Sequence, residues 1–157
     1  GLEKNSTSLN KYLVFEKGNK LNVLDLSTNN INIIEPIKGA EYINISLSPD
    51  QAKIVFEVMG GNMYKINVDG SGLTDLGKGN RPKWSPDSKR IVYVITEDNG
   101  YEIISSDIYL INADGSGKVN LTNSDTIIEM TPSFSPDGKS ILFENYMEGS
   151  IYLMRIE

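Results

Sequence analysis

Two residue types with important chemistry are absent from this 157-residue sequence: cysteine and histidine. Without cysteine the chain has no disulfide, no thiolate metal site and no cysteine nucleophile, although this does not identify the compartment. Without histidine it lacks the usual general base near neutral pH and the commonest metal ligand. Ser-His-Asp and Cys-His catalysis and histidine-held metals are therefore excluded.

Long apolar runs and basic clusters are also missing. No apolar run approaches the roughly 20 residues that span a bilayer, and 15 basic residues face 21 acidic ones, for a net charge of -6. Affinity for nucleic acid depends on basic groups that release counterions. We therefore expect no nucleic-acid partner and no membrane insertion. Because the chain starts at Gly1 without a methionine or an apolar segment, a signal peptide could have been removed before it.

The most informative feature that is present is a repeated turn. Ser-Pro-Asp occurs at Ser48–Asp50, Ser85–Asp87 and Ser135–Asp137, each time between two apolar, strand-like runs. Proline presets φ for the second position of a type I turn, and aspartate suits the third. Asp-Gly-Ser-Gly, a second turn signature, falls between successive copies, at Asp69–Gly72 and Asp114–Gly117. Two turn signatures in alternation indicate a repeat protein.

The runs after the Ser-Pro-Asp turns resemble one another. They are Lys53–Glu57, Arg90–Val94 and Ser140–Glu144, and Tyr12–Glu16 shows the same pattern without a preceding turn. Each has an aromatic residue at its fourth position. These aromatics are Phe15, Phe56, Tyr93 and Phe143, separated by 41, 37 and 50 residues. Such spacings lie in or near the range of a four-stranded propeller blade, about 40–50 residues.

Each repeat contains four strand positions, which we name a to d in chain order. Position b is the run just described. Position a precedes Ser-Pro-Asp, at 43–47, 82–84 and 132–134. Position c is expected at 21–24, 63–66, 108–111 and 151–154, and position d at 31–34, 73–76 and 118–121. β-branched and aromatic residues dominate these runs, and no stretch shows a capped helical period.

The sequence thus predicts an all-β chain of fourteen strands, in antiparallel four-stranded blades of the β-propeller type. The predicted repeat units are about 11–36, 37–78, 79–124 and 125–157, after a flexible N-terminal segment, 1–10. The first unit has no recognisable strand a and the last no strand d, so we expect 3.5–4 blades. Open sheet edges invite pairing, so this ring is incomplete or is completed by an oligomer or by other blades.

Two segments carry a resemblance to a known family. The string Phe134–Phe143, with the block Asp107–Gly117, resembles the WD-like repeat of TolB-type β-propellers. The resemblance covers residues 43–156 well and residues 11–36 loosely. It implies a bacterial protein, periplasmic, cell-surface or secreted, that contacts other proteins through a propeller face.

Some features depart from that family and its relatives. Nothing corresponds to the N-terminal α/β domain of TolB, and there are fewer repeat units than TolB has blades. Related propellers accompany serine-peptidase domains, but this chain has neither a Gly-x-Ser-x-Gly elbow nor a histidine. The lack of histidine equally excludes propeller-type pectate lyases that hold a metal by histidine. We therefore expect no enzymatic activity, no cofactor and no metal site.

Several conspicuous residues are better explained by structure than by chemistry. The aspartates Asp50, Asp87 and Asp137 fit turns stabilised by side-chain hydrogen bonds rather than an acid/base array. Asp-Gly-Ser-Gly lacks the alternating acidic positions of a calcium loop. Tyrosines 64, 109 and 152 recur at one register, which favours packing between blades over an aromatic ligand stripe. Trp84 ends a strand a and is expected in the core.

The candidate binding residues lie on one predicted face. In a blade, the a–b and c–d turns share one face, and the b–c and d–a loops share the other. The second face carries the irregular segments, of which the longest is Thr96–Ser106, and it is rich in acidic residues. Loops on a rigid scaffold are where binding residues concentrate, although a solvated acidic rim explains the pattern equally well. The binding candidates are Arg81, Glu97, Asp98, Tyr101, Glu129, Tyr146 and Glu148.

These features support three functional hypotheses. The first is a non-enzymatic propeller module whose b–c/d–a loop face binds a protein or peptide partner. The second is a carbohydrate-binding or carbohydrate-processing surface protein, in which Tyr101 and Tyr146 stack on a sugar beside carboxylates. The third is a propeller piece of a larger protein, such as a peptidase, or a chain that assembles with other copies.

Overall fold

The described part of the chain folds into four antiparallel sheets. The structure is a computed structural model and describes residues 11–125 and 127–157; the segment 1–10, predicted to be flexible, lies outside this range. The first sheet contains β1 (Tyr12–Glu16), β2 (Leu21–Asp25) and β3 (Asn30–Ile34). The second contains β4 (Tyr42–Leu47), β5 (Lys53–Val58), β6 (Met63–Asn67) and β7 (Thr74–Gly77).

The other two sheets follow the same plan. The third contains β8 (Asn80–Trp84), β9 (Arg90–Asp98), β10 (Ile103–Asn112) and β11 (Val119–Asn120). The fourth contains β12 (Glu129–Phe134), β13 (Ser140–Asn145) and β14 (Ser150–Arg155). We call the sheets blades 1 to 4. Blade 1 supplies positions b, c and d, and blade 4 supplies positions a, b and c.

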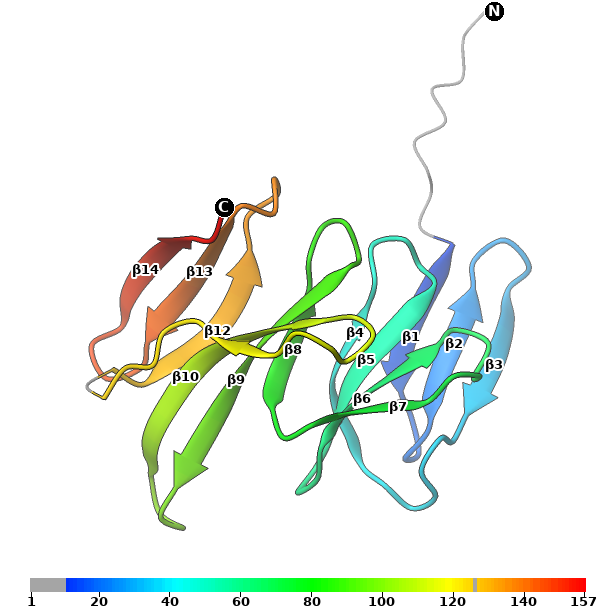
Figure 1. Ribbon diagram of the computed structural model, residues 1–157. Coiled ribbons are helices and arrows are strands. Elements are labelled where there is room, and N and C mark those ends of the chain that lie inside the picture. Colours follow the sequence, from blue (N-terminus) through cyan, green and yellow to red (C-terminus); the bar gives the residue numbers. More distant parts are fainter. Residues whose placement is uncertain (1–10, 126) are drawn as a thin grey trace, which may run out of the picture.

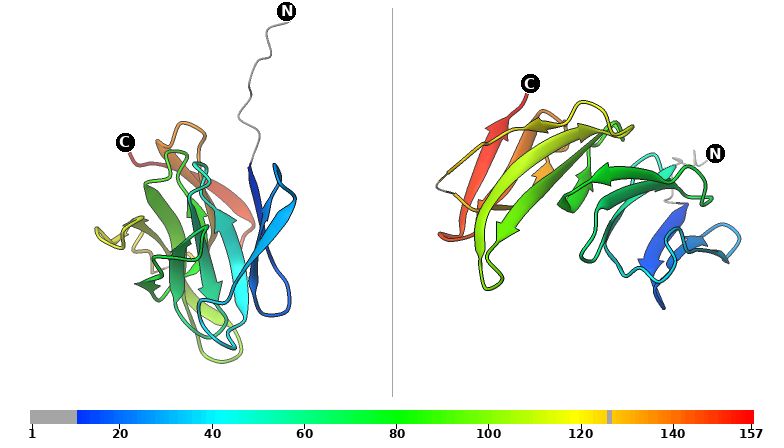
Figure 2. Two further views of the ribbon diagram at one scale, coloured as in Figure 1. Left: turned by 90° about the vertical axis from the view of Figure 1, so that its right-hand side faces the viewer. Right: turned by 60° about the horizontal axis from the view of Figure 1, so that its bottom comes forward.

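The blades stand beside one another along an arc (Figure 1; Figure 2, right). Their innermost strands are adjacent, because β8 lies against both β4 and β12. The Ser-Pro-Asp turns lie at the upper ends of the sheets in Figure 1, and the b–c hairpins lie at the lower ends. The predicted fold is confirmed: in the described part of the chain, fourteen strands form an incomplete arc of propeller-type blades. No helix long and apolar enough to cross a membrane occurs in the part of the chain that the structure describes.

Each Ser-Pro-Asp turn is closed by its own side chains. The serine Oγ donates to the aspartate Oδ1 at 2.5 Å in the first copy and 2.6 Å in the other two. The same Oγ accepts the N–H of the first residue of strand b, at 2.9–3.0 Å. These serine hydroxyls lower the pKa of Asp50, Asp87 and Asp137. The aspartates are therefore engaged in the turns that start strand b.

One predicted loop was wrong. Residues 96–106 were expected to be irregular, but β9 runs to Asp98 and β10 starts at Ile103, so only four residues join them. The two strands pair along this length with one irregularity, between Ile103 and Ser105. The extra residues of the third repeat thus form a longer hairpin, which is stiffer than a loop because its backbone is paired.

The core consists of three apolar seams, one between each pair of neighbouring blades. The first joins Leu21, Val23 and Ile34 of blade 1 to Tyr42, Ile54, Phe56 and Ile66 of blade 2. The second joins Val55, Met63 and Leu76 to Trp84, Ile91, Tyr93 and Ile111. The third joins Val92, Val94 and Ile108 to Ile141 and Phe143. As predicted, Trp84 lies in the core, and its Nε1–H donates to the carbonyl of Ser46, on the preceding inner strand β4, at 2.9 Å.

The recurrent tyrosines contact aromatic residues of their own blade as well as the seams. Tyr64 stacks on Phe56 with ring centroids 5.8 Å apart, and Tyr109 stacks on Tyr93 at 5.7 Å. Both tyrosines also pack against a seam. Tyr93 is fully buried, and its hydroxyl has no hydrogen-bond partner among the described residues. Burial raises the pKa of Tyr93 to about 12.

Every inner strand has a bulge at the same place. The pairing of positions a and b slips within β4, β8 and β12. At the slip stands a non-glycine residue with positive φ: Asn44 at 50°, Arg81 at 54° and Thr131 at 52°. Bulges of this kind redirect side chains. Their repetition gives the side of the arc formed by the inner strands β4, β8 and β12, which we call the channel side, a regular lining of three such residues.

Candidate binding face

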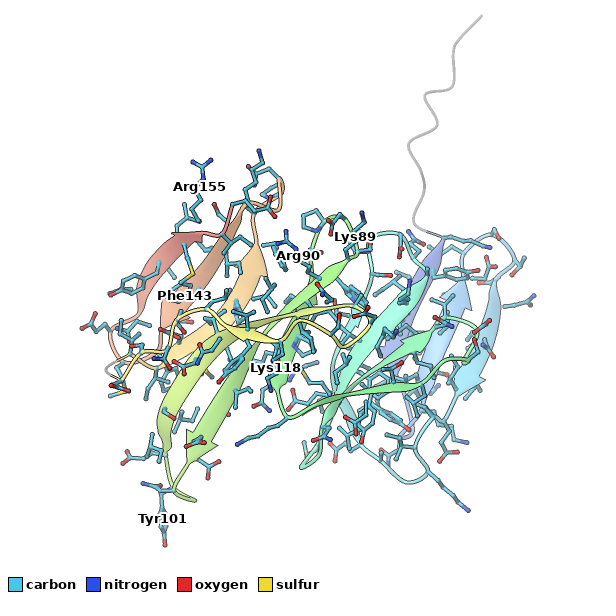
Figure 3. All side chains as sticks on the ribbon, viewed as in Figure 1. Lys89, Arg90, Tyr101, Lys118, Phe143 and Arg155 are labelled. Atoms are coloured by element: carbon cyan, nitrogen blue, oxygen red, sulfur yellow. The ribbon has the colours of Figure 1, made fainter. Side chains whose placement is uncertain are left out.

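The b–c hairpins form the end of the arc opposite the Ser-Pro-Asp turns. Tyr101 marks the tip of the β9–β10 hairpin, whereas Lys89 and Arg90 lie toward the other end of the sheets (Figure 3). The neighbouring hairpins are residues 59–62 in blade 2 and residues 146–149 in blade 4. We call this end, with the d–a connections beside it, the loop face.

A first hollow lies on this face between blades 2 and 3. It has a volume of about 610 Å³. Its walls come from the blade 2 hairpin, the d–a connection and the ends of the long blade 3 strands. The lining residues are Gly60, Gly61, Asn62, Lys78, Gly79, Asn80, Thr96, Glu97, Asp98 and Ile104. Two of the predicted binding residues, Glu97 and Asp98, therefore lie together in a concave site.

A second hollow lies between the hairpin of blade 3 and that of blade 4. Its volume is about 300 Å³. It is lined by Glu102, Ile103, Ile104, Ser105, Ser124, Asp125, Ile127, Ile128 and Met147. Ile104 lines both hollows, so it forms the ridge between them. The loop face is thus a row of two hollows separated by the β9–β10 hairpin.

Exposed apolar side chains follow the same row. They are Met59, Tyr101, Ile104, Tyr146 and Met147, and Tyr101 is 99% exposed. The sequence interpretation identified Tyr101 and Tyr146 but missed Ile104 and both methionines. Ile104 lies at the irregularity between Ile103 and Ser105. Strand alternation therefore does not assign the direction of its side chain, and the sequence alone offers no signal for it.

Arg81 occupies a separate hollow on the channel side of the inner strands. That hollow measures about 320 Å³ and is lined by Asn44, Arg81, Lys83, Thr131, Pro132 and Ser133. Among the described residues, ion pairs are formed by Lys20 with Glu35 and by Arg90 with Glu157. Neither Arg81 nor Lys83 takes part in one. The structure therefore separates the side chain of Arg81 from Glu97 and Asp98.

Glu129 is the predicted binding residue that the structure places in the interior. It is 1% exposed. Its Oε2 accepts the hydroxyl of Thr122 and the N–H of Ile108. Burial raises the pKa of Glu129, with a smaller contribution from the nearby Asp107 carboxylate. Its carboxylate joins β10, β12 and the segment after β11, and a partner at the loop face would not reach it.

This burial predicts a pH effect on stability. The pKa of Glu129 is higher in the folded than in the unfolded chain. The contribution of this side chain to the free energy of unfolding is therefore fully present below the unfolded pKa. It is lost as pH rises through the folded pKa. Glu129→Gln stays neutral, so its free energy of unfolding should rise relative to wild type as the pH increases above about 4, near the usual pKa of a glutamate. Urea unfolding followed by Trp84 fluorescence measures the difference at each pH.

The turn aspartates have lowered pKa values, so their contribution to the free energy of unfolding changes with pH in the opposite direction. Because wild type and Glu129→Gln both contain these aspartates, their effect cancels in the comparison. If the difference in free energy of unfolding between Glu129→Gln and wild type stayed constant from pH 4 to pH 8, this would contradict the assignment of a raised pKa to Glu129.

The remaining candidates, Tyr146 and Glu148, are exposed in the β13–β14 hairpin. Together with Tyr101, Glu97 and Asp98 they lie along the hairpin row, so the structure brings five of the seven candidates to one face. No group of three or more acidic residues that could hold a metal ion occurs within residues 11–125 and 127–157.

Comparisons with known proteins identify the fold. No family model matches the chain, and no curated protein sequence matches it. Among solved structures, a TolB-like protein from Agrobacterium tumefaciens superposes with a TM-score of 0.70 at 23% identity, over 94% of this chain and 58% of that one. An oligogalacturonate lyase in complex with manganese gives 0.72 at 16% identity, over 93% and 48%.

A puromycin-hydrolyzing peptidase from Mycobacterium tuberculosis gives a TM-score of 0.68 at 16% identity, over 94% of this chain and 28% of that one. The chain therefore spans about half, or less, of the length of the lyase and the peptidase and somewhat more of the TolB-like protein. These proteins differ in activity and share an architecture, so the likeness concerns the fold. The chain is built from β-propeller blades, and its fold is similar to that of the TolB-like protein.

Proposed function

We propose that this chain is a non-enzymatic propeller module that binds a protein or peptide partner through its loop face. The observation that carries the proposal is the row of exposed apolar side chains beside two hollows on that face. Aromatic residues and methionine are enriched at protein interfaces, where they fill the dry centre of the contact. A rigid scaffold that displays such residues on its hairpins suits recognition.

The charge of the loop face suggests the chemistry of the partner. The carboxylates of Glu97, Asp98, Glu102 and Asp125 line the two hollows, and Lys78 is the one cation among the lining residues. An acidic rim around an apolar centre favours a partner with apolar anchors and flanking Lys or Arg, because complementary charge speeds encounter and rejects acidic competitors. The partner we propose is therefore a basic, amphipathic segment.

The proposal that the module is not an enzyme is supported by its composition. Neither histidine nor cysteine is present, so the commonest general base and the commonest strong nucleophile are lacking. From the similarity of its fold to the TolB-like protein, we propose that the module is a bacterial periplasmic, cell-surface or secreted protein.

Panning a random peptide display library against the protein tests the proposal. Peptides selected by wild type should be basic and amphipathic. They should lose at least tenfold in affinity, by calorimetric titration, to the double variant Ile104→Ser and Met147→Ser. Val119→Ser is the control, since Val119 is also apolar and is 50% exposed but belongs to the short outer strand β11. Selected peptides that bind the double variant as tightly as wild type would refute the loop face as the site.

The carbohydrate alternative rests on the exposure of Tyr101 and Tyr146. An acidic face repels acidic polysaccharides, so the alternative is limited to neutral or basic sugars. A glycan array decides between the two: binding that is lost in Tyr101→Ala and Tyr146→Ala, with no peptide enriched in the panning, would favour the carbohydrate reading.

A further inference from the structure

Within residues 11–125 and 127–157, the two terminal blades each present one apolar face on which no other blade packs. In blade 1 this face carries Leu13, Phe15, Ile31 and Ile33, and we call it the leading face. In blade 4 it carries Leu142, Ile151 and Leu153, and we call it the trailing face. Contiguous exposed apolar residues on a soluble protein mark an interaction surface.

The repeat shows what normally covers the leading face. Phe15 occupies the fourth position of strand b and is 38% exposed. Phe56 and Tyr93 occupy the same position in blades 2 and 3 and are 0% exposed, because the preceding blade packs on them. The leading face is therefore one half of a blade seam.

The trailing face is the other half. Leu142, at the third position of strand b, is 43% exposed, whereas Val55 and Val92 at that position are 0% exposed. Both valines are covered by the following blade. Ile151 also matches a seam residue: it pairs with Glu144 as Met63 pairs with Glu57.

All three seams in the chain join a trailing-type face to a leading-type face. The free trailing face of one copy and the free leading face of another thus offer the two halves of an interface that the chain itself already forms. Contact between two leading faces would place the fourth-position aromatic residue of one copy, Phe15, against that of the other. None of the three seams has this arrangement.

We propose that copies of this chain associate head to tail, with the trailing face of blade 4 of one copy packed on the leading face of blade 1 of the next. Such a contact is heterologous: it joins different surfaces, and it closes into a ring if the rotation between copies permits. The loop face takes no part in it, so this association is independent of peptide binding.

Light scattering during gel filtration measures the expected association, which grows with protein concentration. Two variants block one face each: Phe15→Glu with Ile33→Glu on the leading face, and Ile151→Glu with Leu153→Glu on the trailing face. Each variant alone should be monomeric, because it retains one half of the interface. A mixture of the two should form a 1:1 heterodimer through the intact trailing face of the first and the intact leading face of the second.

Several outcomes would overturn the proposal. Wild type that stays monomeric at several hundred micromolar would do so, and so would one single-face variant that still dimerises alone, since that indicates like-to-like contact. Circular dichroism of each variant checks that it folds. Tyr101→Ala serves as a control on the loop face and should associate as wild type does.

Discussion

Phe56→Ala should lower the free energy of unfolding by about 3–5 kcal/mol, the usual cost of removing a buried phenylalanine ring. The ring is fully buried in the first seam, where it meets Tyr42 edge to face at 5.3 Å and stacks on Tyr64. Its loss would leave a cavity bordered by both blades. Because native stabilities are about 5–15 kcal/mol, this single change should remove a large share of the total. Urea unfolding followed by Trp84 fluorescence measures it.

Phe15→Ala is the matched control, since Phe15 has the same place in the repeat but only one blade to pack on. Its cost should be about 1 kcal/mol, typical of a substitution outside the closed core. Both variants are compared at a protein concentration where wild type is monomeric. Equal destabilisation by the two changes would show that the seam does not determine the energy at this position.

Glu57→Ala should have the second largest effect and lower the free energy of unfolding by about 3 kcal/mol, because it leaves three hydrogen-bond donors without an acceptor. The Glu57 carboxylate is buried between blades 2 and 3. It accepts the amide of Asn44 at 2.8 Å within its own blade, and the amide of Asn80 at 2.7 Å and the N–H of Arg81 at 3.2 Å from the next blade. The carboxylate thus fixes both bulges of neighbouring inner strands.

Glu144→Ala provides the comparison. Glu144 has the same repeat position in blade 4, where Thr131 of its own blade donates to it at 3.3 Å, and no other blade among the described residues donates to it. Its removal should cost under about 1 kcal/mol. Thermal unfolding monitored by circular dichroism compares the two alanine variants with wild type. Similar melting temperatures for both would mean that the contacts of Glu57 across the seam add nothing.

The strands were predictable because local signals agree with the tertiary structure. Ser-Pro-Asp sets the start of strand b through bonds confined to six residues, and alternation then assigns Phe56 and Val55 to opposite seams. Trp84 could be placed in the core for the same reason. Even the three-strand first and last blades followed from missing turn signatures rather than from any long-range contact.

Features that depend on contacts between repeats could not be predicted. Glu129 looks like any acidic residue of a loop, and its burial depends on Thr122 and Ile108 of the preceding blade. Arg81 was grouped with Glu97, but a bulge turns it toward the channel. The long hairpin was misjudged because Gly100 and the polar residues around it are typical of loops, whereas their pairing depends on strands of unusual length.

All three seams join a trailing face to a leading face, and this shared arrangement affects how such a chain can change in evolution. Every internal blade carries a leading and a trailing face, so a duplicated segment of about 40 residues would arrive already fitted to both neighbours. Loss of an internal blade would equally bring two compatible faces together. A change in the number of blades by whole units would therefore keep the trailing-to-leading arrangement of the seams, while the hairpins of the loop face diverge independently of the seams.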